Sequence, residues 1–196
     1  MRARLLEATI DLLAERGFAA TTSTVVSERA GVSRGAQLHH FPTKNDLVVA
    51  AVEHVMAARI EALAVDAESL PTAGLERTRA VLQIFADYFT SPRFMAALEL
   101  WVGARTDPEL LAQVGPLEQQ VGRGAHRVAV QLLEVDESIP GNRELVQETL
   151  DLIRGLGLAS TISDDTRRRM RILDHWAVVL DRELDRSAPD PTQEQR

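Results

Sequence analysis

Residues 31–47 read Gly-Val-Ser-Arg-Gly-Ala-Gln-Leu-His-His-Phe-Pro-Thr-Lys-Asn-Asp-Leu, and this stretch decides how the first part of the chain folds. It predicts a turn at Gly31, a short helix after Ser33, a break at Pro42 and a long helix from about Lys44. Ser33 favours the first helix start because its hydroxyl can accept a hydrogen bond from a backbone N–H two or three residues ahead. Pro42 ends that helix because proline disfavours α geometry at the residue before it.

Lys44 indicates what the start of the long helix binds. A cation at a helix N-terminus opposes the helix dipole unless an anion also lies there, and helix N-termini bind phosphate well. Lys44 is the only lysine in the chain, so it does not reflect a lysine-rich composition. A short polar helix beside a phosphate site is typical of a helix-turn-helix unit that binds DNA.

The composition favours packed helices and excludes several kinds of site. The 196 residues are 45% hydrophobic but only 4% aromatic, whereas strands are enriched in aromatic and β-branched residues. The absence of cysteine excludes disulfides and thiolate chemistry and removes the commonest zinc ligand. We find neither an apolar run long enough to span a membrane nor an apolar secretory core after the N-terminus. We therefore expect a cytoplasmic protein with no membrane association and no cofactor.

The net charge of −7 argues against nucleic-acid binding only if its distribution is ignored. Residues 1–47 carry six basic and five acidic side chains, and the excess of negative charge lies in the rest of the chain. Residues 29–44 contain three cations, two histidines and no acid. The surface that could face an anion is therefore small and local.

Helical periodicity between Gly and Pro breaks predicts an all-α chain of about nine helices. We expect a domain boundary near residues 45–50, bridged by the fourth helix, and a disordered polar tail at 187–196. The predicted helices cover approximately residues 2–16, 23–30, 34–40, 44–67, 75–90, 93–104, 108–135, 143–161 and 164–185.

The first 47 residues resemble the N-terminal DNA-binding domain of TetR-type bacterial transcriptional regulators. The order and spacing of these residues carry the resemblance: Gly17-Phe18, Thr21-Thr22, Ala30-Gly31-Val32-Ser33, Gly35, His40-Phe41, Lys44 and Leu47. The later part of the chain resembles the family in helix number and length only. The resemblance implies a three-helix helix-turn-helix domain at 1–47 and a helical effector-binding and dimerisation domain at 48–186.

Nine residues are the predicted DNA contacts on this basis: Thr21, Thr22, Ser33, Arg34, Gly35, Gln37, His39, His40 and Lys44. Several have a plainer alternative. Arg34 could be a solvated arginine, and Thr22 could only cap the second helix. His39 and His40 are not expected to hold a metal, because adjacent helical residues point about 100° apart.

The pair Gln37-Leu38 departs from the family, which usually has an apolar residue followed by tyrosine here. The family's tyrosine reaches a phosphate, and Leu38 cannot. Leu38 either enters the core or meets a thymine methyl group, while Gln37 either reads an adenine edge or faces solvent.

Two further sets are predicted in the C-terminal part. An effector pocket would be lined by Phe85, Tyr88, Phe89, Met95, Glu99, Trp101, Arg105 and His126, although core packing is an alternative for any one of them. The last two helices would pair with a second copy through Leu152, Leu156, Leu173, Trp176, Ala177, Leu180 and Leu184. The last helix carries two apolar lines, and the alternative is that both belong to the core.

The resemblance implies a transcriptional regulator, most simply a repressor, that binds a palindromic operator in double-stranded DNA as a homodimer and responds to a small-molecule effector. The alternative is a ligand-binding or protein-docking module that has lost specific DNA binding, which the Gln37-Leu38 pair keeps open. We do not expect an enzyme, because the sequence offers no convergent catalytic set or Gly-rich phosphate loop.

Overall fold

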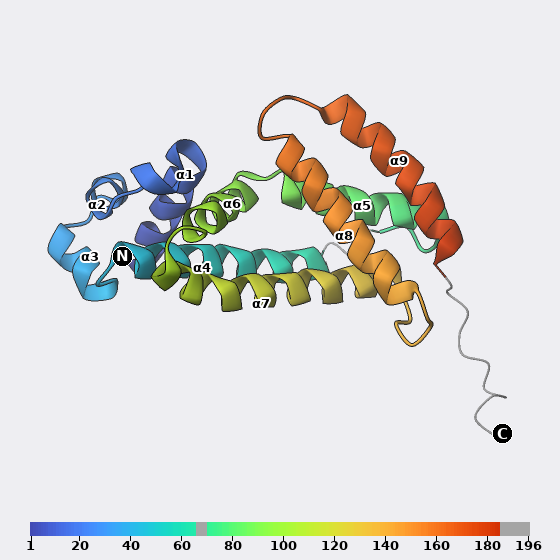
Figure 1. Cartoon of the computed structure of the whole chain (residues 1–196), viewed down its shortest axis with the longest axis horizontal. Helices are drawn as coiled ribbons and strands as arrows, with labels where there is room; N and C mark the ends of the chain where they lie inside the picture. The colour runs from blue at the N-terminus through green and yellow to red at the C-terminus, as the bar shows by residue number, and fades with distance from the viewer. Residues whose placement is uncertain (66–69, 185–196) are drawn as a thin grey trace, which may run out of the picture. The chain divides into compact units, whose positions relative to one another are not determined.

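The computed structural model describes the backbone of residues 1–65 and 70–184, and the side chains of residues 1–56 and 70–184. Within these ranges the chain forms helices and no strands, which confirms the all-α prediction (Figure 1). The helices there are α1 (Arg2–Ala20), α2 (Ser23–Ala30), α3 (Arg34–His40), α4 (Lys44–Val65), α5 (Gly74–Phe89), α6 (Pro92–Ala104), α7 (Pro108–Leu133), α8 (Asn142–Ala159) and α9 (Thr166–Glu183). The tail predicted at 187–196 lies outside the described residues.

Local capping sets the helix boundaries near the N-terminus. The Thr22 hydroxyl accepts a hydrogen bond from the Val25 N–H at the start of α2, and Ser33 does the same for the Ala36 N–H of α3. Gly31 ends α2 in the left-handed conformation at φ 61°, which glycine adopts at little cost. Before α4, the Thr43 side chain accepts from the Asp46 N–H and the Asp46 carboxylate accepts from the Thr43 N–H. This reciprocal pair is a capping box.

The chain divides into two compact units. The first comprises Met1–Ala62 and Thr90–Arg123, and the second comprises Leu63–Phe89 and Gly124–Arg196. This division does not follow the boundary predicted near residues 45–50, because α6 packs on α1 and so joins the N-terminal helices. The assignment of DNA binding to residues 1–47 is a functional division and stays a prediction.

The core of the first unit lies between α1 and α6. Both helices bury apolar side chains, among which Leu5 and Leu12 of α1 and Leu100 of α6 are fully enclosed. Gly17 has φ 76° and interrupts the helical geometry of α1, as expected for a C-terminal stop. The segment after Gly17 therefore leaves the α1 axis and positions Phe18 beside α6.

The second unit packs α5 against α8 and α9. Leu173, Ala177 and Leu180 of α9 are buried in this core. Two long-range hydrogen bonds support the packing. The Trp176 indole donates to the Thr149 hydroxyl at 3.0 Å, and the Thr78 hydroxyl donates to the Asp181 carboxylate at 3.0 Å.

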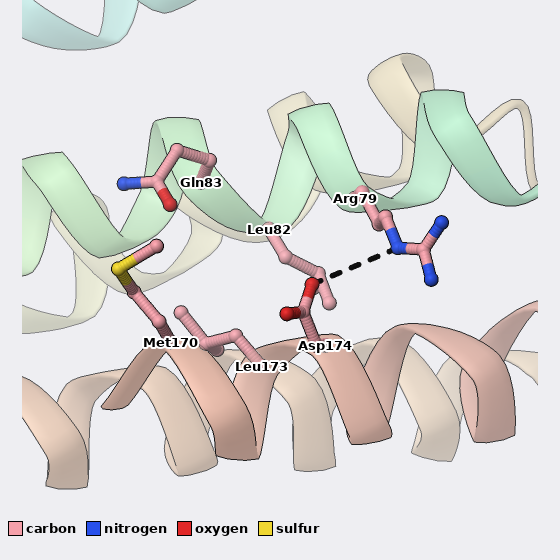
Figure 2. Close-up of a pocket in the computed structure, with 6 residues that line it drawn as sticks. All are labelled: Arg79, Leu82, Gln83, Met170, Leu173 and Asp174. Carbon is pink, nitrogen blue, oxygen red and sulfur yellow. Dashed lines mark ion pairs between the residues drawn. The ribbon is translucent and has the colours of Figure 1, made fainter. Parts of the chain in front are cut away.

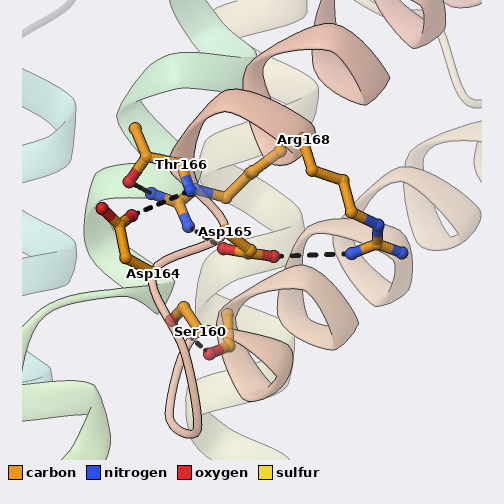
Figure 3. A network of polar contacts seen from close by, with 7 residues as sticks. Ser160, Asp164, Asp165, Thr166 and Arg168 are labelled. Atoms are coloured by element: carbon orange, nitrogen blue, oxygen red, sulfur yellow. Dashed lines mark hydrogen bonds and ion pairs between the residues drawn. The ribbon is translucent and has the colours of Figure 1, made fainter.

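A polar network orders the turn between α8 and α9 (Figure 3). The Ser160 hydroxyl donates to the Gly157 carbonyl at 2.7 Å, and the Thr166 N–H donates to the Asp164 carboxylate at 3.0 Å. Asp165 forms ion pairs with Arg168 at 3.4 Å and Arg169 at 2.6 Å, one turn into α9. Acidic groups at this helix start complement its dipole and fix where α9 begins. None of the described helices has the length and apolar character needed to cross a membrane.

Candidate functional site

The outer face of α3 is exposed along its whole length. Arg34, Gly35, Leu38, His39 and His40 all face solvent. The Arg34 guanidinium donates to the Thr24 hydroxyl of α2 at 3.3 Å, so its position is set by the helix that precedes the turn. For Leu38, which is 44% exposed, the structure rules out the core alternative and leaves an outward position.

Gln37 is the buried residue of α3, and its predicted contact with DNA is wrong for this structure. The residue is 0% exposed, and its side-chain oxygen accepts a hydrogen bond from the Ser27 hydroxyl of α2. Gln37 precedes the buried Phe41 by four residues, so the two share one helix face. The hydrogen bond between Ser27 and Gln37 joins α2 to α3.

The two threonines before α2 have different environments. Thr21 is 0% exposed and its hydroxyl donates to the Gly17 carbonyl at 2.8 Å, so its predicted side-chain contact with DNA is also wrong. Thr22 is exposed and caps α2. Ser33 is likewise exposed while capping α3, so both hydroxyls remain available to an external phosphate.

Lys44 is turned toward its own chain. Its ammonium donates to the Phe18 carbonyl at 2.7 Å and lies 3.9 Å from the centroid of the Phe18 ring, a cation–π contact. Burial lowers the pKa of Lys44. The side chain is only half-buried, so phosphate binding stays a prediction, but its observed contacts link the start of α4 to the end of α1.

Phe18 is also held from the side of α6. Its backbone N–H donates to the Glu99 carboxylate at 3.2 Å, and its ring covers Gly103 so closely that a Cβ there would lie 2.6 Å from a ring carbon. Glu99 was predicted as a polar contact for an effector, and in this structure it instead binds the N–H at the end of α1. The contacts of Phe18 therefore connect α6 to Lys44.

Replacing Gly103 with alanine should displace the Phe18 ring and lower the free energy of unfolding by about 1 kcal/mol. The ring must move by several tenths of an ångström, which weakens its contact with Lys44. Gly122→Ala is the matched control, because its Cβ would meet nothing within 4 Å in the α7 helix. Urea denaturation followed by circular dichroism measures the stability of both variants. Equal midpoints for Gly103→Ala and Gly122→Ala would contradict the close packing of Phe18 on Gly103.

Comparisons with known proteins agree with this geometry. Residues 5–51 match the family described as bacterial regulatory proteins, tetR family. The HTH-type transcriptional regulator CymR of Pseudomonas putida is 31% identical over 173 residues, covering 86% of this chain and 83% of that protein. The uncharacterized HTH-type transcriptional regulator Rv2912c of Mycobacterium tuberculosis is 31% identical over 154 residues, covering 79% and 75%.

The chain belongs to the tetR family. It is a transcriptional regulator with a helix-turn-helix DNA-binding unit, and it is not an enzyme. Solved structures share the fold at low identity. A putative transcriptional regulator from Pseudomonas aeruginosa has a TM-score of 0.73 at 22% identity, with 93% of this chain and 90% of that chain covered.

Two further structural neighbours were solved with small molecules. FadR from Bacillus subtilis, in complex with stearoyl-CoA, has a TM-score of 0.68 at 16% identity, with 94% of this chain and 100% of that chain covered. A putative regulator from Saccharomonospora viridis, in complex with choline, has a TM-score of 0.69 at 15% identity, with 93% and 96% covered. At these identities the likeness establishes the fold alone.

The predicted effector residues of this tetR-family chain fall into both units. Phe85, Tyr88, Phe89 and His126 are buried in the second unit, whereas Met95, Glu99, Trp101 and Arg105 belong to the first. The His126 ring nitrogen Nε2 lies 2.8 Å from the Glu137 carboxylate, and this hydrogen bond lowers the pKa of Glu137. Arg105 is exposed on the surface. Whether any of the eight binds an effector stays a prediction.

A small pocket between α5 and α9 contains none of the predicted effector residues (Figure 2). Its volume is about 50 Å³, which is far below the several hundred Å³ of a typical ligand site. Arg79 and Asp174 face one another across it at 3.7 Å. This pocket is suited to water or an ion pair rather than to an effector.

The predicted dimer residues are mostly core of their own chain. Leu156, Leu173, Ala177, Leu180 and Leu184 are buried in the second unit, so they cannot form the interface directly, and that part of the prediction is wrong. They face inward because the packing of α5, α8 and α9 uses this apolar line. Leu152 and Trp176 are half-buried.

Sequence reasoning missed the large apolar side chains that the second unit leaves exposed. They are Leu158 of α8, Ile162 of the following turn, and Met170 and Val178 of α9, and we use the name α8–α9 apolar surface for these four exposed side chains. Hydrophobic periodicity could not find them, because it marks the strongest apolar line and that line is the core. The described residues contain no group of three or more His, Asp or Glu side chains placed to hold a metal ion.

Proposed function

We propose that this chain is a ligand-responsive repressor that binds a palindromic operator as a homodimer in the cytoplasm. The observation that carries the proposal is the outward row of α3, from Arg34 to His40, which projects next to two capping hydroxyls. A short exposed helix of this kind fits the major groove, where its side chains meet base edges.

The roles within α3 follow from exposure. Arg34 and His39 supply hydrogen bonds to bases, Leu38 supplies apolar contact with a thymine methyl group, and Gly35 allows close approach to the backbone. Thr22 and Ser33 donate to phosphates and fix the register. Gln37 acts indirectly, because its contact with Ser27 holds α3 against α2.

Arg34→Ala should weaken binding to the preferred DNA sequence by about 1–2 kcal/mol, because a bidentate contact with a guanine is lost. The probe is a duplex that the wild-type protein selects from a random-sequence library, and competition with mixed-sequence DNA measures discrimination. Arg93→Ala on the exposed start of α6 removes the same charge away from α3 and is the control. Unchanged discrimination in Arg34→Ala would reject the assigned role.

The same selection separates the two functional hypotheses. A regulator enriches one sequence, and two-fold symmetry requires half-sites about one helical turn apart or a multiple of it. A module that has lost specific DNA binding enriches none. Repression is then tested with a reporter gene placed behind the selected sequence, whose expression should fall when the protein is produced.

The effector is proposed as a small molecule whose class is open. Stearoyl-CoA and choline, found with two proteins of the same fold, are chemically unlike, so neither transfers to this chain. An effector can release DNA only by binding one arrangement of the protein more tightly than the other. The effector would be identified by screening a compound library for molecules that raise the melting temperature of the protein and weaken its binding to the selected duplex.

A further inference from the structure

The partial negative charge at the C-terminal end of α3 is not neutralised by Lys44. The C-terminal end of a helix carries a partial negative charge, which repels a DNA phosphate. The last turn of α3 contains His39 and His40, and the ammonium of Lys44, the nearest lysine or arginine beyond the helix end, is engaged by the Phe18 carbonyl and ring. An arginine or free lysine for a phosphate beside this end of α3 therefore has to come from elsewhere in the chain.

Arg2 provides that cation from the start of α1. Its guanidinium carbon lies 5.5 Å from the centroid of the Phe41 ring, and Phe41 is the residue at which α3 ends. The Phe41 ring also neighbours the exposed His40 ring, with centroids 6.4 Å apart. Figure 1 places the N-terminus near α3 and the start of α4.

The surroundings of Arg2 leave its donors for an external group. Arg2 is exposed, and within the described part of the chain no carboxylate lies at ion-pair distance from it. Arg29, by contrast, pairs with Glu15 at 2.7 Å. Contact with an aromatic face orients a guanidinium while its N–H edge stays free, and that edge matches the geometry of a phosphate.

We propose that Arg2 binds a backbone phosphate of the DNA whose groove α3 enters, so that the DNA interface extends onto α1. This rests on the proposed placement of α3 in the groove. Arg2 carries no sequence information in this role. It fixes the orientation of the recognition helix and contributes the salt-dependent part of the affinity.

Arg4 in the same helix offers a matched control. Two helical residues apart, Arg2 and Arg4 point to nearly opposite sides of α1. Arg4 lines a hollow of about 190 Å³ together with Glu7, Asp11 and Arg29. Arg2→Gln and Arg4→Gln therefore remove the same formal charge from different surroundings.

The experiment measures binding of the full chain to the selected duplex by fluorescence anisotropy over KCl concentrations from about 0.05 to 0.3 M. For Arg2→Gln we expect the slope of log affinity against log salt to flatten by about 0.9 per protomer and so by about 1.8 for the proposed dimer, which is about a 60-fold loss at 0.1 M salt relative to 1 M. The affinity of Arg2→Gln for a scrambled duplex should fall by the same factor. Arg2→Lys should keep most of the slope, and Arg4→Gln should match the wild type.

The outcomes separate this proposal from the proposed function. If Arg2→Gln leaves the slope unchanged, or if Arg4→Gln flattens it equally, the phosphate contact is refuted. Arg34→Ala would still lose sequence discrimination in that case, and the regulator proposal would stand. If the library yields no preferred sequence, the proposed placement of α3 fails instead. Circular dichroism melting of each variant confirms that the fold is retained.

Discussion

Gly157→Ala is expected to lower the free energy of unfolding by about 3 kcal/mol, the upper end of the range for overpacking. Gly157 is buried in α8, where a Cβ would lie 2.4 Å from the backbone oxygen of Phe89 and 2.9 Å from its Cβ. A backbone oxygen cannot rotate away as the tip of a side chain can. The added methyl group must therefore push α8 away from α5, and the second unit loses packing along that contact.

Thermal or urea unfolding at fixed protein concentration measures the effect. Gly122→Ala again serves as the control, since it has open space and should be neutral or stabilising by up to about 1 kcal/mol. For a chain of this size, 3 kcal/mol corresponds to a fall of about 6–12 °C in melting temperature. Equal melting temperatures for the two variants would contradict the observed approach of α8 to α5.

Local sequence signals were sufficient to predict α2 and α3, whereas α1 continues to Ala20, beyond the end predicted near residue 16, with non-helical geometry at Gly17. Thr22, Gly31 and Ser33 act through hydrogen bonds and backbone angles that involve only two to four neighbouring residues. Such signals do not depend on the rest of the fold. This is why the boundaries of α2 and α3 agree with the prediction.

The buried face of α3 could not be predicted from the periodicity of the helix alone. A helix of seven residues is too short for hydrophobic periodicity to identify its inward face. Phe41 just beyond its end supplies the missing signal, because a buried aromatic residue fixes the face that contains the residue four positions earlier. Applied to the sequence, that spacing would have placed Gln37 inward and His39 on the opposite side, but it would not have predicted the exposure of Arg34 and Leu38, which lie seven and three residues before Phe41.

Contacts between distant residues could not be predicted. Glu99 and the Phe18 N–H are separated by 81 positions, and Lys44 reaches a carbonyl 26 positions away. A charged residue at the surface of a helix has many possible partners, and only the packing of α1 on α6 selects among them. The same holds for Arg2, whose position beside Phe41 depends on how α1 and α3 come together.

The apolar lines of α9 show a second limit of prediction from the sequence. A line at helical spacing indicates burial but does not tell whether the covering surface belongs to the same chain. Leu180 is fully buried by its own chain, so a charge there would unfold the protein rather than separate subunits. A test of dimerisation must instead use a side chain that the single chain leaves exposed.

Leu158→Glu is that test, and it is expected to yield monomers that bind the operator at least about 100-fold more weakly. Leu158 is 53% exposed on α8, within the α8–α9 apolar surface, whose Ile162 is 91% exposed. A second copy would remove these side chains from water, and a buried unpaired carboxylate would oppose that association. A monomer binds half-sites singly, and linked binding of two sites typically strengthens affinity by about 10²–10⁴.

Leu111→Glu is the matched control, because Leu111 is 50% exposed on α7 and lies outside the α8–α9 apolar surface. Sedimentation velocity gives the oligomeric state of each variant, and anisotropy with the selected duplex gives its affinity. Because both leucines are half exposed, each variant should keep the helical circular dichroism spectrum of the wild type. A Leu158→Glu variant that sediments as an intact dimer would assign the interface to another surface, and equal losses in both variants would attribute the effect to added negative charge near DNA.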